Sequence, residues 1–519
     1  MNRRILTTIF SAASACLCSV TLCAATPSSS KVSDLGKIPP ASIRYDNVHY
    51  RNPWLRSGNV AGMRSDSLSI SEALLGGQYS AGENRLLSRA PRQWEVGASA
   101  STIMHLKRFS MAGSFSFLQT TMYDACGGMF LSQGRYPVEI YEYTPGTKSR
   151  QQYSFNGGFS VDLNNQWRIG AVVDFKSTNY SKRKDLRYTD YALDLSLRPG
   201  LQWHSDKWSV GVSALLQRNT ETITAEQIGV AQTTYLAFLD KGMFFGVEQS
   251  WDGGGVHLSE PGISGFPVRS VGWGASAQLS WSDALYFDLS FIHGDGSIGE
   301  KDAIWMIFPS DEFASTLQWK LHSDSGTEHI LCLDASLTKD RLDENVIEKV
   351  TQSGVTTRKI YSSNVVSSRS NLCITPCWTA VRPSVYELKV EASYTRGDAL
   401  SSCQYPYLNG QILQSVSFAA EARYTTGARL TPILGVWAET GFLDEDSRIA
   451  GDIVSKTSPV RQQTYYDNWK WFATTPGIGV RAGLRYTFAN ALYLELSGNA
   501  VFRGGKNRHE AGLSFGYTF

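Results

Sequence analysis

Apolar and polar side chains alternate with a period of two along most of this chain. From Trp167 to Phe175, apolar residues take the odd positions and mostly polar or small residues take the even ones. Successive side chains of a β-strand point to opposite faces of a sheet, so the pattern predicts strands with one apolar and one polar face. The last run, Leu513–Phe519, has the same alternation and ends on an aromatic residue.

The alternating runs are about 9 to 12 residues long, which is the length that a tilted strand needs to cross a bilayer. Aromatic residues stand near the ends of the apolar rows, as Trp273 and Trp281 do, where a barrel carries its interfacial girdles. Tight connections such as 164–165 alternate with long polar stretches at 123–151, 177–189, 218–272, 295–312, 397–411 and 440–476. Short turns on one side and long loops on the other are typical of an outer-membrane barrel.

We therefore predict an all-β fold, a transmembrane antiparallel up-and-down β-barrel with short periplasmic turns and long extracellular loops. Seventeen strands can be placed from residue 94 onward, and a barrel with both ends in the periplasm requires an even number. The missing strand is predicted at 67–80, which gives about 18 strands; if 67–80 and 371–382 are not strands, the alternatives are 16 or 14. Loop 218–272 can also contain a hairpin near 231–250.

The amino-terminal segment has the pattern of a secretory signal peptide at residues 1–25. A basic start is followed by an apolar or small stretch from Ile5 to Leu22 and by the small residues Cys23-Ala-Ala25. A membrane anchor and a lipoprotein acylated at one of three cysteines are the alternatives. Residues 26–66 are predicted to lie in the periplasm or the lumen, and residues 67–519 to form the barrel.

The polar faces of the predicted strands carry charges of both signs, which we expect to line the lumen. Twelve candidates are Asp162, Arg168, Asp174, Asp194, Arg198, Asp288, Glu391, Glu421, Arg423, Arg481, Arg485 and Glu495. Charges away from bulk water need partners or hydration, so these residues either brace the wall or form a selectivity ring. The formal net charge of +2 gives no reason to expect a nucleic-acid partner.

Catalytic or metal-binding chemistry finds little support in the sequence. The eight histidines are scattered, and no serine or acidic pair accompanies them in a short motif, so we predict no enzyme activity and no catalytic residue. Cys373 and Cys377 lack a second pair for zinc, and they are either paired across a turn or free. Segment 293–302 is acidic and glycine-rich; a solvated turn is favoured over a calcium loop because the EF-hand spacing is missing. No metal and no cofactor is expected.

The signal peptide, the Asn52-Pro-Trp54 segment, the long hairpins and the terminal Phe519 resemble an uncharacterised outer-membrane β-barrel family of Gram-negative bacteria. The resemblance implies the fold and the outer membrane, with its lipids and the barrel-assembly machinery as partners, and it implies no substrate. Asn52-Pro53 also resembles an element of long-chain fatty-acid channels. The chain is too short for a TonB-dependent receptor with a folded plug domain.

Three functions are compatible with these features. The first is a channel or transporter for a small or hydrophobic solute, since a barrel of 16–18 strands is wide enough for an aqueous lumen. The second is a binding or assembly platform for a surface lipoprotein or a secretion partner, because unusually long loops are often functional. A membrane enzyme is the third and is disfavoured.

Overall fold

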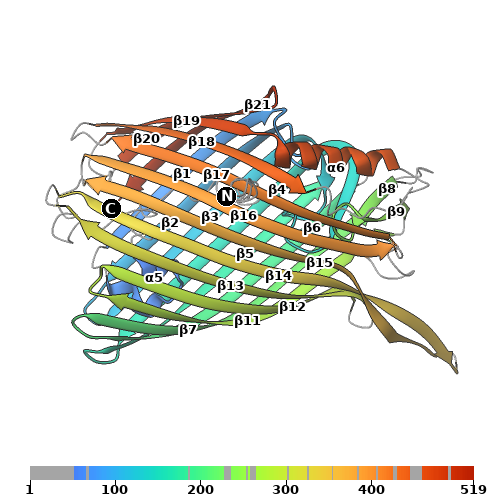
Figure 1. The fold of residues 1–519 in the computed structure, drawn as a ribbon, viewed down its shortest axis with the longest axis horizontal. Helices are drawn as coiled ribbons and strands as arrows, with labels where there is room; N and C mark the ends of the chain where they lie inside the picture. Colours follow the sequence, from blue (N-terminus) through green and yellow to red (C-terminus); the bar gives the residue numbers. More distant parts are fainter. Residues whose placement is uncertain are drawn as a thin grey trace, which may run out of the picture.

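The computed structural model describes residues 52–65, 69–184, 187–226, 235–252, 255–256, 265–300, 303–323, 326–353, 355–382, 385–404, 407–424, 429–444, 459–488 and 492–518. In these residues, 18 antiparallel strands form the wall of one closed barrel, and β8 to β10 are additional (Figure 1). The wall consists of β1 (Ile70–Gly82), β2 (Arg92–His105), β3 (Phe109–Gly128), β4 (Glu139–Asp162), β5 (Trp167–Lys182), β6 (Arg187–His204), β7 (Trp208–Glu226), β11 (Phe266–Trp281), β12 (Leu285–Glu300), β13 (Ala303–His322), β14 (Glu328–Gln352), β15 (Val355–Arg382), β16 (Tyr386–Gln404), β17 (Tyr407–Tyr424), β18 (Leu430–Asp444), β19 (Gly477–Thr487), β20 (Leu492–Arg503) and β21 (Lys506–Thr518).

The first and the last strand close the barrel. Residues Glu72–Gly82 of β1 pair antiparallel with Arg508–Thr518 of β21. The strand predicted at 67–80 from parity is therefore confirmed as β1, and the weak segment 371–382 is confirmed as part of β15. Closure leaves no free sheet edge, which is what a membrane-spanning sheet requires.

Several strands extend well beyond the predicted bounds. The connections predicted at 177–189, 295–312 and 397–411 are largely strand, and β12 and β13 come within three residues of each other at Glu300 and Ala303. The solvated turn predicted at 293–302 is likewise wrong, because His293–Glu300 belongs to β12. The backbone pairing of the strands continues beyond the membrane, where both faces of the sheet are polar. The alternation of apolar and polar residues therefore stops before the strand ends.

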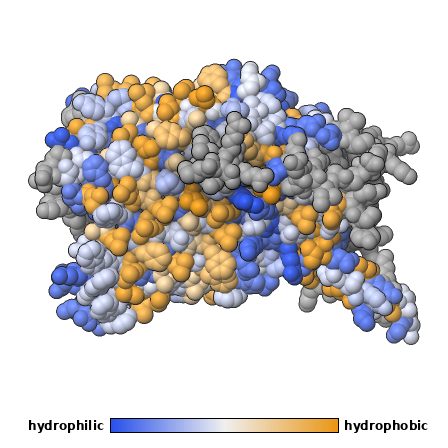
Figure 2. Space-filling view, viewed as in Figure 1, coloured by the Kyte–Doolittle hydropathy of each residue, from blue (hydrophilic) through white to orange (hydrophobic). Residues whose placement is uncertain are grey.

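The outward-facing side chains form the apolar surface that the alternation predicts. Leu195, Phe287 and Leu513 are 42%, 40% and 51% exposed on outward positions. Figure 2 shows the resulting hydrophobic band around the wall that faces the viewer. Across the described residues, no helix is long and apolar enough to span a membrane.

Three smaller parts lie inside or over the barrel. The α-helix α5 (Pro53–Arg56) and the 3-10 helix η3 (Val60–Ser65) precede β1. Strands β8 (Tyr235–Asp240), β9 (Gly246–Asp252) and β10 (Gly255–Val256) lie between β7 and β11, and β8–β9 is the hairpin predicted near 231–250. The helix α6 (Pro459–Thr474) lies between β18 and β19, over one end of the barrel (Figure 1).

The described cysteines form no disulfide, and Cys373 and Cys377 lie four residues apart on β15. The predicted signal peptide, residues 26–51 and the terminal Phe519 lie outside the described residues.

Candidate functional site in the barrel lumen

The segment from Asn52 to Ser65, which we call the plug, lies inside the barrel near the short turns. Asn52 starts α5 as its N-cap, with its side chain accepting a hydrogen bond from Trp54 N at 3.1 Å, and Pro53 takes the first helical position. The Asn52 amide also donates to Met63 O at 2.7 Å, which ties α5 to η3. These local bonds make the plug a compact unit rather than a passing strand.

Apolar contacts seat the plug against inward-facing residues of the wall. Trp54 is 1% exposed and its ring meets Tyr286 of β12 edge to face, with centroids 5.6 Å apart. On the other side, plug residues such as Met63 share a buried cluster with Ile103 of β2 and Val172 of β5. The apolar contacts of the plug thus extend along the inner wall from β1 round to β12.

Two glycines provide the space for this contact. A Cβ atom on Gly200 of β6 would lie 2.2 Å from Asn59 Oδ1, and one on Gly211 of β7 would lie 2.4 Å from the Trp54 ring. Asn59 uses the space to donate to Gln278 Oε1 at 2.8 Å and toward the carbonyl of Leu201 at 3.3 Å. The wall is therefore shaped for the plug.

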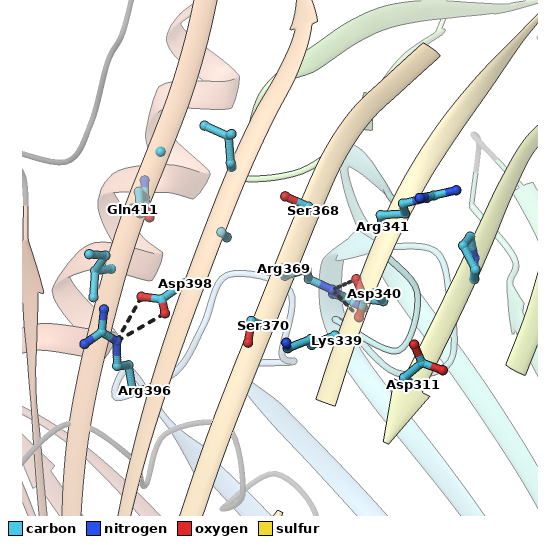
Figure 3. A pocket seen from close by; sticks show the side chains of 15 residues that line it. Asp311, Lys339, Asp340, Arg341, Ser368, Arg369, Ser370, Arg396, Asp398 and Gln411 are labelled. Carbon is cyan, nitrogen blue, oxygen red and sulfur yellow. Dashed lines mark hydrogen bonds and ion pairs between the residues drawn. The ribbon is translucent and has the colours of Figure 1, made fainter. Parts of the chain in front are cut away.

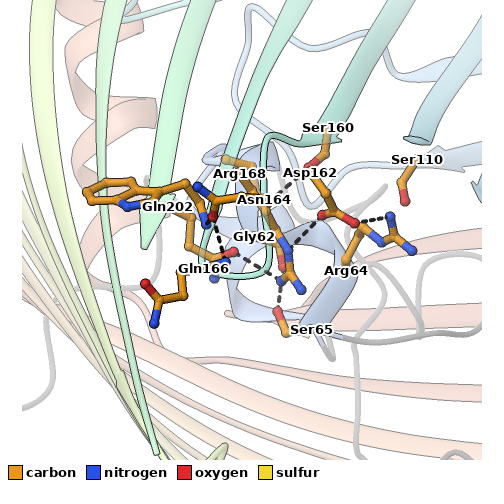
Figure 4. Close-up of polar contacts among 12 residues, drawn as sticks. Gly62, Arg64, Ser65, Ser110, Ser160, Asp162, Asn164, Gln166, Arg168 and Gln202 are labelled. Atoms are coloured by element: carbon orange, nitrogen blue, oxygen red, sulfur yellow. Dashed lines mark hydrogen bonds and ion pairs between the residues drawn. The ribbon is translucent and has the colours of Figure 1, made fainter. Parts of the chain in front are cut away.

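Ion pairs fix both ends of the plug. Arg64 Nη1 lies 2.5 Å from Asp162 Oδ2, and Arg168 Nε lies 3.0 Å from the other oxygen of the same carboxylate (Figure 4). Arg56 Nη2 lies 3.0 Å from Asp334 Oδ1. Burial lowers the pKa of Arg56, but Asp334 and neighbouring groups outweigh this effect and leave the pKa above its ordinary value. Arg56 therefore stays charged.

The inner wall of β16 to β20 carries a second set of charges. Neighbouring groups pair along it: Lys389 with Glu391 at 2.7 Å, Glu421 with Arg423 at 2.8 Å and with Arg481 at 3.2 Å, and Arg485 with Glu495 at 2.7 Å. We call this row the charge ladder. Its members satisfy one another within the wall and need no plug residue as a partner.

All twelve charged residues named from the sequence occupy inward-facing positions. Eight have their described hydrogen bonds and ion pairs with groups of the wall: Asp174, Asp288, Glu391, Glu421, Arg423, Arg481, Arg485 and Glu495. Asp162 and Arg198 contact the plug, through Arg64 and Ser57 O, and Arg168 shares Asp162. Asp194 instead pairs with Arg135 from the opposite end of the barrel. The described contacts divide the set among the plug, the charge ladder, the separate wall positions Asp174 and Asp288, and the end near Arg135, and they do not join the set into one ring.

The long connections close over the end of the barrel opposite the short turns. We call residues 129–138, the β8–β9 hairpin and α6 the cap. Phe130 and Tyr136 pack among inward-facing apolar residues such as Phe266 and Phe308. Tyr465 of α6 packs on Tyr141, with ring centroids 5.0 Å apart. The cap is thus an apolar layer inside the mouth.

A buried polar contact joins the cap to the wall. The Tyr136 hydroxyl donates to Glu221 Oε2 at 2.8 Å, and the backbone N–H of Leu131 donates to the other oxygen at 2.9 Å. Burial, followed by the adjacent Glu221 charge, raises the pKa of Tyr136, so its hydroxyl remains a donor. Because these groups are buried away from water, a donor or acceptor that lost its partner here would remain without a hydrogen bond, which costs free energy.

Sequence reasoning did not identify the residues that seat the plug and the cap. Asn52-Pro53 is a helix-start signal, and Pro459 marks the start of α6 in the same way. Neither signal indicates where the short helix docks, because the partners are distant in sequence. In the described part of the chain no group of three or more His, Cys, Asp or Glu residues is arranged to hold a metal ion.

A family model described as "Family of unknown function (DUF6850)" matches residues 60–519. No curated protein matches the chain in sequence.

Several solved structures resemble this chain at low sequence identity. The ferric preacinetobactin receptor BauA from Acinetobacter baumannii is 7% identical, with a TM-score of 0.39 over 87% of this chain and 80% of that one. OpdK from Pseudomonas aeruginosa, solved with vanillate, is 10% identical, with a TM-score of 0.34 over 87% and 98%. The CymD monoaromatic hydrocarbon channel is 10% identical, with a TM-score of 0.31 over 89% and 90%. These values do not bear on ligand or activity.

Proposed function

The chain belongs to the family of unknown function DUF6850, and we propose that this outer-membrane barrel is a gated channel for a small solute. The observation that carries the proposal is the contrast between the two faces of its wall. The outer face is apolar, whereas the inner face carries paired charges between a docked plug and a docked cap. A barrel whose interior was simply filled by packed side chains would not need charged residues on its inner face.

The plug is the proposed gate at the periplasmic end. Its polar contacts with the wall are discrete: the ion pairs of Arg56 and Arg64, the Asn59 amide and the Arg198 contact with Ser57 O. The Trp54 ring and the buried apolar cluster around Met63 add to them. Release of so short a segment would expose Asp162 and Asp334 to the lumen without disturbing any strand pairing. Gating therefore requires no change in the barrel itself.

The charge ladder favours a hydrated solute over a hydrophobic one. Its guanidinium and carboxylate groups alternate, so a passing polar molecule would meet donors and acceptors at each step. A hydrophobic solute would have to desolvate these groups without replacing their hydrogen bonds, which costs free energy.

Planar-bilayer recording tests the proposal. The full chain is expected to give small, intermittent currents, and Arg56→Ala combined with Arg64→Ala is expected to give larger, steadier ones because the plug loses both ion pairs. Lys389→Ala changes a lumen charge without touching the plug and serves as the matched control. The absence of current from both the full chain and the double variant, together with no solute uptake into vesicles, would refute the channel.

The hairpin β14–β15 favours a second candidate, a platform for a surface lipoprotein or a secretion partner. It projects away from the barrel at the lower right of Figure 1, and its described residues Val346, Ile360 and Tyr361 are 47%, 51% and 71% exposed. A photo-crosslinking residue at position 361 in native membranes is expected to capture a partner, whereas one at Leu289, on the outer face of β12, is not. Equal labelling at both positions, or none at 361, argues against the platform.

We also infer that β21 and Phe519 engage the barrel-assembly machinery during insertion. The outward row of β21 is Leu513, Phe515 and Tyr517, each more than 40% exposed. Phe519→Ser is expected to slow appearance of the heat-modifiable folded form in cells, and unchanged assembly kinetics would contradict the inference.

A further inference from the structure

The outer face of the wall contains a hollow that the channel does not use. It has a volume of about 660 Å³ and lies on β13 to β17 (Figure 3). Its polar lining includes Asp311, Lys339, Arg341, Ser370, Arg396 and Asp398. Asp311 and Lys339 lie two positions from Phe313 and Leu337, which are paired across β13 and β14, so all four side chains point outward.

Strand register explains the shape of the hollow. Lys339 and Arg341 of β14 stand opposite Ser370 and Ser368 of β15, and Ser370 in turn stands opposite Asp398 of β16. The two serines are short, whereas the basic side chains of β14 and Arg396 of β16 are long. The serines therefore form a floor between two polar rims.

The level of the hollow indicates what covers it. On the same strands, the outward positions nearer the short turns are apolar, including Leu317 on β13 and Leu333 on β14, which are both 42% exposed. The hollow begins where this row ends, on the side of the long connections. Figure 2 shows a hydrophilic patch beside the hydrophobic band on this wall. In an outer-membrane barrel this level corresponds to the headgroups of the outer leaflet.

The charges suit an anion, because the basic side chains of the lining outnumber the acidic ones and the Asp311 carboxylate already lies 2.7 Å from His293 Nδ1. Arg396 Nε lies 3.1 Å from Asp398 Oδ1, and Arg341 Nη2 lies 3.1 Å from Asp343 Oδ2. Each aspartate orients a guanidinium group, whose remaining N–H donors stay available. Lys339 is exposed between them and adds a compact positive charge.

We propose that this hollow binds a phosphate group of lipid A, the phosphorylated glucosamine disaccharide lipid of the outer leaflet. The basic rims hold the phosphate, the serine floor accommodates the sugar, and the acyl chains follow the apolar row below. Basic pockets on membrane proteins bind phosphorylated headgroups in this way. The proposal depends on the position of the barrel in the outer membrane and is independent of the channel.

Native mass spectrometry of the full chain in detergent tests the proposal, with bisphosphorylated lipid A as the probe. Lys339→Ser combined with Arg396→Ser is expected to weaken binding at least tenfold, because two charge-assisted contacts with the phosphate are lost and a tenfold change corresponds to only about 1.4 kcal/mol. Arg218→Ser, an exposed outward arginine on β7, is the matched control and should leave binding unchanged. Heat-modifiable migration in gels verifies that each variant is folded.

Two further probes identify the headgroup. Dephosphorylated lipid A should be retained weakly by the native chain, and phosphatidylglycerol should be retained less than lipid A. Equal retention of the dephosphorylated lipid would overturn phosphate recognition. Equal retention of phosphatidylglycerol, or an equal loss in Arg218→Ser, would overturn the assignment of lipid A to this hollow.

Discussion

Gly200 and Gly211 show how single residues on the wall decide whether the plug docks. Substituting either with alanine places a Cβ atom within 2.4 Å of Asn59 or Trp54, so the plug must shift. Overlap of this kind costs about 1–3 kcal/mol, which would shift the equilibrium between docked and undocked plug by roughly fivefold to 150-fold. We therefore expect Gly211→Ala to raise the open probability in planar bilayers.

Gly435 of β18 is the matched control for this substitution. A Cβ atom there lies 3.4 Å from its nearest neighbour, Arg481 Cβ, an ordinary contact away from the plug. Gly435→Ala should leave the open probability unchanged. If Gly435→Ala raised it as much as Gly211→Ala did, the effect would belong to the wall and not to the plug.

The sequence predicts which side of the wall a strand residue faces, but it does not predict which distant residue that side chain will contact. The alternation around Asp162 is enough to turn its carboxylate inward, because each strand residue faces opposite to its neighbour. Its partner Arg64 lies 98 residues away in a segment without periodicity. Such a pairing depends on the closed barrel, which local patterns do not encode.

At the scale of elements, the cap is expected to respond to pH through β8. Burial raises the pKa of Asp240 to about 6, although the backbone N–H groups of Gly242 and its neighbours act to lower it. In an undocked hairpin the carboxyl would titrate near 4. Between about pH 6 and pH 4 the docked carboxyl is protonated while the undocked one is ionised, so acidification stabilises the docked cap.

Currents should therefore be smaller at pH 5 than at pH 7, and Asp240→Asn should flatten this dependence because the amide cannot ionise. Its Oδ1 can still accept the 2.8 Å bond from Gly242 N. Asp206→Asn, in an exposed turn at the other end of the barrel, is the control. A pH response that persists in Asp240→Asn would assign the effect to another group.

The elements differ in how far the sequence predicted them. The membrane-crossing parts of β19 and β21 were predictable because lipid on one side and lumen on the other impose a strict period of two. The helix α6 lies in a stretch predicted as a loop. Tyr465 and Tyr466 pack against Tyr141 of β4 and Phe244 of the β8–β9 hairpin, residues that are distant in sequence. Its anchors are tertiary, so no local signal marks them.

At the scale of the whole molecule, the barrel closes where β1 pairs with β21. The register of this pairing can be tested with engineered cysteines. Ala73 and Tyr517 are partners across this seam and both point outward. Directly paired residues have Cα atoms about 4.5–5.5 Å apart, within disulfide range. With the native cysteines replaced by serine, Ala73→Cys with Tyr517→Cys should form a disulfide that changes gel migration on reduction.

Ala73→Cys with Leu513→Cys supplies the offset control, since Leu513 pairs with Gly77, four residues along β1. That separation exceeds the roughly 7 Å between Cα atoms beyond which a disulfide cannot form without backbone movement. Crosslinking of the first pair alone would establish both closure and register. Crosslinking of the offset pair instead would shift β1 by four residues against β21, which would carry the attached plug away from Gly200 and Gly211 and remove the physical basis for the gate.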